Sequence, residues 1–342
     1  MKKVTILIGT PSDLYFASEI EVQCHNFRKF GYSSILQVVV HGTEEDKYKE
    51  YWDKLAAKYK EVKFFFYTSP AIEKNLKIYP PFGRPWSFKK HWEAYPELKN
   101  HVIIYLDSDV IFTRHLDFSK YINDDICYMS KTPYVGAKYF YSKEKDVLPF
   151  MKSRYKMIDP LEIFCNQVGI DKQVVIDNEE NTGGCQYILK GIDADFWASL
   201  SEDCLKLRIQ SQSLNSDYFA NEERGFQSWA IGDMCGLLWN LWKRGKETRC
   251  PEELGFSWSS SSIEEYEKHA FFHNAGVPSR YIEKDGKKHL MFYKSDVRFR
   301  TSMTTFFDLE YEGLSKDFCS YKYVEAIKEV EDPVCKTNIK QY

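Results

Sequence analysis

The sequence lacks the features that mark several classes of protein. Its nine cysteines, at positions 24, 127, 165, 185, 204, 235, 250, 319 and 335, are odd in number and never spaced as Cys-x-x-Cys. This pattern favours neither a zinc knuckle nor a disulfide framework. No apolar run reaches the roughly 20 residues that cross a bilayer, and the run near the start is too short for a secretory signal. We therefore expect a cytoplasmic protein with reduced thiols and no membrane span.

The chain also lacks a large excess of charge of either sign. It has 47 Lys and Arg against 50 Asp and Glu, a formal charge of -3, so no general field attracts a polyanion. This argues against a dedicated nucleic-acid binder but not against a local basic patch. What the chain does have is 342 residues, of which 16% are aromatic. These suffice for a sizeable core and for surfaces that hold ring-shaped ligands.

The first third of the sequence alternates apolar, strand-like runs with amphipathic, helix-like runs. The expected order is strand 3–9, helix 14–30, strand 34–40, helix 44–60 and strand 62–67. This βαβαβ order predicts an α/β protein with a Rossmann-like, mostly parallel mixed sheet flanked by helices. Ligands of such sheets bind beyond the carboxyl ends of the strands.

Later elements are less regular. We expect helices at 85–95, 193–207 and 226–242, and short strands at 173–176, 186–189 and 270–276. From about residue 285 onward, charged and aromatic residues alternate without a period that would place any element.

The most informative run is residues 101–112, which places Asp107 and Asp109 inside an apolar segment. In an extended backbone, residues two apart share one face, so the two carboxylates can converge on one ligand. Unpaired carboxylates in apolar surroundings are costly, whereas a hard divalent cation prefers oxygen ligands. The run therefore predicts a metal site. The alternative is an ordinary Asp-rich turn at a strand end, although such a turn would normally bring Gly, Pro or Asn and end the apolar run.

Further motifs follow this pair along the chain. They are Asn181-Thr182-Gly183-Gly184, a helix bearing Trp229 and Asp233, and His273-Asn274-Ala275-Gly276. Together with the βαβ half and the Asp-x-Asp, this order resembles a metal-dependent glycosyltransferase of the GT-A fold. The similarity covers roughly residues 3 to 280 and is closer to the glycogenin-like and the hydroxyproline or serine glycosyltransferases than to processive synthases. It implies one catalytic domain over 1–285, with a nucleotide-binding half (1–112) and an acceptor half (113–285), and an extension of unknown role over 286–342.

The resemblance also implies roles for individual residues. Asp107, Asp109 and His273 would hold Mn²⁺ or Mg²⁺, which bridges the diphosphate of a nucleotide sugar, with UDP as the expected nucleotide, and neutralises charge on the leaving group. For His273 a core histidine is the alternative, and imidazole would suit Mn²⁺ better than Mg²⁺. The residues expected to contact the donor are Gly9, Thr10, Pro11, Lys89, Asp107, Ser108, Asn181, Thr182, Gly183 and Gly184.

Several of these assignments have simpler alternatives. Lys89, beside Lys90, can equally lie on a solvated helix face, and Gly183-Gly184 can form a plain hairpin turn. Asp233 is an acid in an otherwise apolar helix, so it is the candidate general base for the acceptor hydroxyl of a glycan or a protein. It can also bind sugar hydroxyls, or serve only as a salt-bridged or helix-terminal Asp.

The chain departs from the resembling families in one place. Those families have a longer closing motif, His-x-x-Gly-x-x-Lys-Pro-Trp. This chain has no Lys at the corresponding place after His273, and Arg280 can supply the charge instead. This leaves the retaining or inverting outcome open.

Two other functions compete with sugar transfer. A haloacid-dehalogenase-type phosphatase also has Asp-x-Asp after an apolar strand, but on its opening strand and followed by Thr or Val where this chain has Ile111. The other is a carbohydrate-binding protein without turnover.

Overall fold

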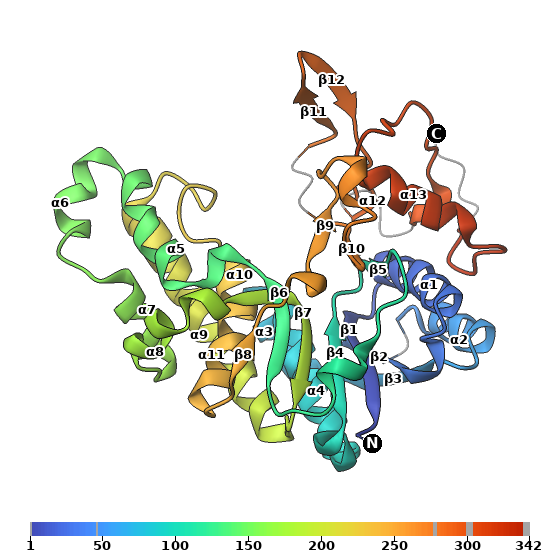
Figure 1. The fold of residues 1–342 in the computed structure, drawn as a ribbon, viewed down its shortest axis with the longest axis horizontal. Coiled ribbons are helices and arrows are strands. Elements are labelled where there is room, and N and C mark those ends of the chain that lie inside the picture. Colours follow the sequence, from blue (N-terminus) through green and yellow to red (C-terminus); the bar gives the residue numbers. More distant parts are fainter. Residues whose placement is uncertain (1, 46, 276–278, 299–303, 338–342) are drawn as a thin grey trace. The chain divides into compact units, whose positions relative to one another are not determined.

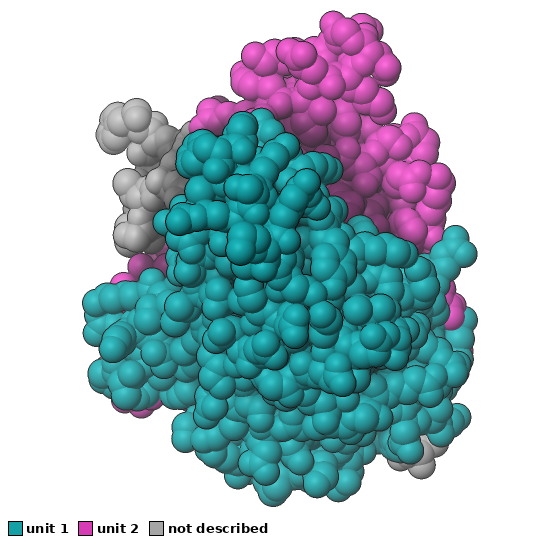
Figure 2. Space-filling view, turned by 90° about the vertical axis from the view of Figure 1, so that its left-hand side faces the viewer, with its two compact units in different colours: residues 1–4, 69–105, 119–252 teal, residues 5–68, 106–118, 253–342 magenta. Residues whose placement is uncertain are grey.

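The computed structural model describes residues 2–45, 47–275, 279–298 and 304–337 (Figure 1). The chain divides into two compact units, which Figure 2 colours separately. The first unit contains residues 1–4, 69–105 and 119–252, and the second contains residues 5–68, 106–118 and 253–342. Each unit is described by itself below.

In the described residues the strands form three sheets. Their bounds are β1 (Val4–Pro11), β2 (Leu36–Gly42), β3 (Lys63–Thr68), β4 (Val102–Leu106), β5 (Val110–Phe112), β6 (Cys127–Lys131), β7 (Gly183–Lys190), β8 (Thr248–Arg249), β9 (Phe256–Trp258), β10 (Phe271–His273), β11 (Tyr281–Lys284) and β12 (Lys287–Leu290). The seven-stranded sheet has the order β3-β2-β1-β4-β7-β6-β8, a three-stranded sheet has the order β5-β10-β9, and β11 pairs with β12. The pairs β1–β2, β2–β3 and β6–β8 are parallel and β6–β7 is antiparallel.

Helices occupy the segments between the strands. Their bounds are α1 (Leu14–Lys29), α2 (Lys49–Lys58), α3 (Glu73–Ile78), α4 (Gly83–Ala94), α5 (Ala137–Ser142), α6 (Lys152–Tyr155), α7 (Pro160–Val168), α8 (Lys172–Asp177), α9 (Ala194–Tyr218), α10 (Ser228–Ala230), α11 (Gly236–Lys243), α12 (Ser295–Arg298) and α13 (Ser320–Glu329). The mixed, mostly parallel sheet flanked by helices confirms the predicted α/β class. In the part of the chain that the structure describes, no helix combines the length and apolarity needed to cross a membrane.

The predicted βαβαβ order is confirmed in the second unit by β1, α1, β2, α2 and β3. Local signals in the sequence explain the bounds of α1. The Asp13 side chain accepts a hydrogen bond from the backbone N–H of Tyr15, which satisfies one of the free donors at the helix start. The helix ends just before Gly31, whose φ of 79° is the left-handed conformation that glycine adopts without strain.

One predicted strand is wrong. Residues 173–176 were expected to be extended because Val174, Val175 and Ile176 are β-branched, but they lie in helix α8. The Asp171 side chain accepts from the N–H of Gln173 and caps this helix, and the cap outweighs the modest β-propensity of a short run.

Other elements differ in extent. The helix expected at 193–207 continues to Tyr218 as α9. The helix expected at 226–242 is interrupted by a π-helical turn, Ile231–Cys235, between α10 and α11. The strand expected at 270–276 is β10, and Gly276 lies outside the described residues.

In the second unit, the described part of residues 286–342, called the C-terminal segment below, shares a core with helix α1 (Figure 1). Tyr15 of α1 packs against Phe306, and Tyr323 of α13 stacks on Phe292 with ring centroids 5.9 Å apart. All four rings belong to one buried apolar cluster. The segment for which the sequence predicts no element is therefore built into the unit that contains β1 and α1.

Candidate metal centre

Asp107 and Asp109 lie in the tight connection between β4 and β5. The backbone N–H of Val110 donates to the carbonyl of Asp107 across 3.3 Å, which closes a turn. The amide nitrogen of Gln23 on α1 donates to the carbonyls of Asp107 (2.9 Å) and Val110 (2.8 Å) and holds this turn. The apolar run does resume in β5, as expected, but the two acids are related by the turn and not by the alternation of an extended strand.

Strand β10 brings His273 to the same place. It pairs antiparallel with β5 so that His273 lies opposite Val110, and the N–H of Asn274 donates to the carbonyl of Asp109 (2.9 Å). The imidazole also stacks on the ring of Trp258 in β9, with centroids 5.4 Å apart and planes 20° apart. The backbone pairing and the stacking together fix the direction of the ring.

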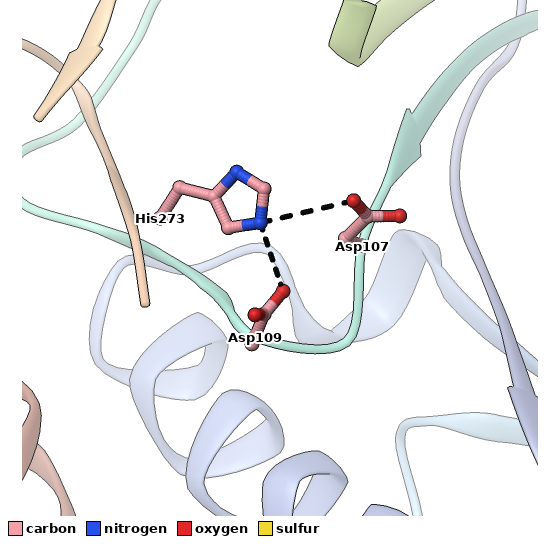
Figure 3. Close-up of side chains that lie close together, drawn as sticks. All are labelled: Asp107, Asp109 and His273. Atoms are coloured by element: carbon pink, nitrogen blue, oxygen red, sulfur yellow. Dashed lines mark ion pairs between the residues drawn. The ribbon is translucent and has the colours of Figure 1, made fainter. Parts of the chain in front are cut away.

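The three side chains converge on one point (Figure 3). His273 Nε2 lies 3.1 Å from Asp109 Oδ1 and 3.8 Å from Asp107 Oδ2. One ligand atom from each residue lies within 4.8 Å of the others. Two carboxylates and an imidazole are a donor set that suits Mn²⁺ and Mg²⁺, with the imidazole favouring Mn²⁺. The residues that the sequence singled out as metal ligands are therefore brought together in a geometry that fits a divalent cation.

The three ligands differ in their access to solvent. The side chains of Asp109 and His273 are 8% and 6% exposed, whereas that of Asp107 is 26% exposed. Asp109 and His273 are thus fixed within the protein, and the cluster meets solvent on the side of Asp107.

Two further charged residues surround Asp109, and sequence reasoning missed both. The Lys294 ammonium donates to Asp109 Oδ2. Glu19 of α1 is fully buried and accepts a 2.6 Å hydrogen bond from the hydroxyl of Ser108. Lys294 lies in a stretch where the sequence predicts no element, and Glu19 has the spacing of an ordinary amphipathic helix, so neither carried a local signal.

Burial and charge compete in this cluster. Burial raises the pKa of Glu19 to about 7, against the opposing attraction of Lys294 and the hydrogen bond from Ser108. Burial would also raise the pKa of Asp109, but the charges and hydrogen bonds of Lys294 and His273 outweigh it and hold that pKa well below its usual range. The pKa of Lys294 is raised, because attraction by Asp109 and Glu19 exceeds the effect of its own burial. Asp109 is therefore ionised near neutral pH.

The other donor-contact candidates of the second unit lie at strand ends. Gly9, Thr10 and Pro11 form the end of β1, where Pro11 pairs in register with His41 of β2. Thr10 is fully buried. Ser108 is 8% exposed, with its hydroxyl on Glu19. Contact of these residues with a nucleotide stays a prediction.

Lys89 and the Asn-Thr-Gly-Gly motif belong to the first unit. Lys89 of α4 forms an ion pair with Glu93 one helical turn away (3.0 Å). Gly183 and Gly184 begin strand β7, following Asn181 and Thr182. Their contact with a donor is likewise untested.

Packing explains why the two positions carry glycine. A Cβ on Gly184 would come 1.9 Å from Met234 Cε, and one on Gly183 would come 2.5 Å from the carbonyl oxygen of Ser130. The space that a side chain would need at these two positions is therefore occupied, at least in part, by neighbouring atoms of the protein itself.

Asp233 lies in the π-helical turn of the first unit and forms an ion pair with Arg84 of α4. The two side chains are 19% and 18% exposed. Trp229, four positions earlier, is 52% exposed, and its ring centroid lies 6.3 Å from that of Tyr134. Turns of π-helix are rare and occur often at functional sites.

Comparison with known proteins gives matches among solved structures only. No family model matches the chain, and no curated protein matches it. The apo structure of the WbbM bifunctional glycosyltransferase matches 95% of this chain with 10% identity and a TM-score of 0.42, but only 52% of its own length is covered. Mouse xyloside xylosyltransferase 1, apo form, matches 81% of this chain and 100% of its own, with 10% identity and a TM-score of 0.36.

A third structure is the galactosyltransferase LgtC in complex with donor and acceptor sugar analogs. It matches 81% of this chain and 90% of its own, with 11% identity and a TM-score of 0.38. Each of these proteins carries a glycosyltransferase name. TM-scores below 0.5 leave the function of this chain to be inferred from its own side chains.

Proposed function

We propose that this protein is a metal-dependent glycosyltransferase that passes a sugar from a nucleotide-sugar donor, UDP-linked in our proposal, to a hydroxyl acceptor. The observation that supports this most is the convergence of Asp107, Asp109 and His273, three ligand types for a divalent cation, at a strand end. Open α/β sheets bind their ligands beyond strand ends of this kind.

Within this proposal, Asp107, Asp109 and His273 hold Mn²⁺ or Mg²⁺. The bound cation would supply Lewis-acid neutralisation of the charge that develops on the departing diphosphate. The chain's own residues orient the ligands. Gln23 fixes the turn that carries both acids, and Trp258 fixes the plane of the imidazole. Lys294 keeps Asp109 ionised, which a metal ligand requires.

The donor contacts in the proposal are those that the resemblance implies. Gly9, Thr10, Pro11 and Ser108 would border the nucleoside at the ends of β1 and β4. Lys89 would offset phosphate charge, and the segment from Asn181 to Gly184 would lie against the sugar.

The acceptor site of the proposal centres on Asp233. Pairing with Arg84 favours the ionised carboxylate, which can accept a proton or a hydrogen bond from a sugar or protein hydroxyl. The exposed ring of Trp229, flanked by Tyr134, offers an apolar face of the kind on which a pyranose stacks. Both features are compatible with a glycan or a glycosylated protein as acceptor.

A thermal-shift panel tests the proposal. UDP, GDP, ADP and TDP are each added with and without Mn²⁺ to the natural protein and to Asp109→Asn, which keeps the shape of the side chain but removes its charge. We expect one nucleotide to raise the melting temperature only with Mn²⁺, and this rise to disappear in the variant. Equal stabilisation in both proteins, or none, would contradict the proposal.

The same samples separate the competing functions. A haloacid-dehalogenase-type phosphatase would be stabilised by beryllofluoride, which mimics a phosphorylated Asp. A carbohydrate-binding protein without turnover would bind glycans regardless of metal and would release no nucleotide from a nucleotide sugar. A glycosyltransferase would release the nucleotide diphosphate slowly when water replaces the acceptor.

A further inference from the structure

The two carboxylate oxygens of Asp109 have different partners. Oδ1 faces His273 Nε2 at 3.1 Å, on the side where Asp107 also converges. Oδ2 accepts a charge-assisted hydrogen bond from the ammonium of Lys294. Because the side chain of Asp109 is only 8% exposed, it has little freedom to exchange these two roles.

Lys294 is held from both ends. Met291 and Phe292, just before it, are buried, and Phe292 stacks on Tyr323 of α13 with ring centroids 5.9 Å apart. Helix α12 begins immediately after it, at Ser295. The side chain of Lys294 is 27% exposed, so most of it lies within the protein. The backbone that carries its ammonium is therefore anchored by buried neighbours on its N-terminal side.

Glu19 gives this ammonium a second counter-charge. It lies on α1, is 1% exposed, and attracts Lys294 electrostatically. Its carboxylate also accepts from the hydroxyl of Ser108, the residue between the two aspartates. Glu19 thus holds the turn through Ser108, while the direct hydrogen bond to Asp109 Oδ2 comes from Lys294 itself.

Divalent cations differ in how they use carboxylates. Ca²⁺ takes about six to eight oxygens and often binds both oxygens of one carboxylate, whereas Mg²⁺ requires a compact octahedron of about six ligands, each carboxylate giving one oxygen. Mn²⁺ accepts mixed oxygen and imidazole ligands. A carboxylate that can give only one oxygen therefore penalises Ca²⁺ more than Mn²⁺ or Mg²⁺.

Building on the proposed metal site, we propose that Lys294 restricts Asp109 to a single metal-facing oxygen and thereby selects Mn²⁺ and Mg²⁺ against Ca²⁺. Lys294 acts through Asp109 and is a positioning residue. The C-terminal segment, by supplying this lysine, sets the cation specificity of a site whose ligands all come from elsewhere in the unit.

The test measures cation affinity and not activity. Mn²⁺ affinity is obtained from its electron paramagnetic resonance signal, and Ca²⁺ affinity from competition with Mn²⁺, in the natural protein and in Lys294→Met, Lys294→Arg and Glu19→Gln. Methionine keeps most of the stem of the lysine but has no charge, so Asp109 Oδ2 is released. We expect the ratio of Ca²⁺ to Mn²⁺ affinity to rise at least about tenfold in Lys294→Met. It should stay within about twofold of the natural value in Lys294→Arg and Glu19→Gln, which keep a cation at Oδ2.

The outcomes separate this inference from the function on which it rests. A natural protein that binds no Mn²⁺ would reject the metal site itself. A folded Lys294→Met that binds one Mn²⁺ per chain with an unchanged Ca²⁺ to Mn²⁺ ratio would reject only the role of Lys294. If Lys294→Met does not fold, infrared spectra of the natural protein decide. The two carboxylate stretches of Asp109 are identified as the bands that are lost in Asp109→Asn. In the natural protein with Mn²⁺, the splitting between these two bands should be that of one-oxygen binding. A splitting typical of two-oxygen binding would reject the inference.

Discussion

At Asp109 a nearly buried carboxylate is kept ionised by the contacts that Lys294 and His273 make with it. Asp107 and Asp109 are conspicuous because acids are rare within apolar runs. His273 is conspicuous because it ends a short apolar strand. Lys294 and Glu19 complete the cluster through tertiary contacts alone, and a sequence pattern that describes neighbours along the chain does not report such contacts.

Asp233 gives a prediction about activity. As a general base it would accept the proton of the attacking hydroxyl, and Asp233→Asn keeps its shape and its contact with Arg84 while removing the basic group. We expect turnover of the nucleotide sugar to fall by about 10²–10⁴ with little change in KM. The control is Glu144→Gln, whose partner Lys156 lies with it on the exposed surface of the first unit. A raised KM with unchanged turnover would instead assign Asp233 to binding sugar hydroxyls.

His91 gives a prediction about pH. It is fully buried in α4, and this burial lowers its pKa to about 4, whereas in the unfolded chain it is near 6.5. Between these two values the unfolded chain binds a proton that the folded protein does not. The contribution of His91 to stability is therefore complete above about pH 6.5 and is lost as the pH falls toward 4, by at most about 3 kcal/mol.

Urea unfolding between pH 4 and 7.5 checks this prediction for the natural protein and for His91→Gln, which does not titrate. The difference in unfolding free energy between the two proteins should shrink as the pH falls. A difference that stays constant over this range would show that His91 does not titrate in this way.

At the scale of elements, the sequence predicted those whose limits are set locally. Helix α1 has a capping Asp before it and Gly31 after it, and its bounds agree with the expectation to within about one residue. Helix α8 was missed because three β-branched residues in a short run are ambiguous, and the cap at Asp171 decided the outcome. In the C-terminal segment helix α13 was missed, although its buried residues Ser320, Tyr323 and Ile327 have helical spacing. Its apolar face packs into a core shared with α1.

Glu21 connects these elements and gives a prediction about stability. It is fully buried on α1, pairs with Lys58 of α2 at 3.0 Å, and accepts from the backbone N–H groups of Val334 (2.8 Å) and Cys335 (2.9 Å). Glu21→Gln removes the charge that strengthens all three contacts. We expect the unfolding free energy to fall by about 2 kcal/mol and the amides of residues 334–337 to exchange faster with solvent.

Hydrogen exchange read by mass spectrometry, together with urea unfolding, provides the measurement. Glu50→Gln is the matched control, because Glu50 pairs with Lys54 on the exposed surface of α2 and surface pairs of this kind contribute little. If Glu21→Gln and Glu50→Gln behave alike, the buried carboxylate does not hold the C-terminal segment.

At the scale of the whole molecule, each compact unit contains a distinct part of the proposed chemistry. The second unit contains all three residues of the proposed metal centre, which lie in the turn after β4 and in β10, together with Glu19 of α1 and Lys294 of the C-terminal segment. The first unit contains Asp233, Arg84 and the exposed Trp229. The order of motifs along the chain predicted both sets, but not that residues beyond 286 would support the metal centre.

The most direct test is pulsed electron paramagnetic resonance of Mn²⁺ bound to the whole protein. We expect one Mn²⁺ per chain with a nitrogen coupling from an imidazole, loss of that coupling in His273→Gln, and loss of the bound ion in Asp109→Asn. The coupling reports the ligand directly and does not depend on knowing the donor or the acceptor. A bound Mn²⁺ without nitrogen coupling, or one that persists unchanged in Asp109→Asn, would contradict the metal centre and the function built on it.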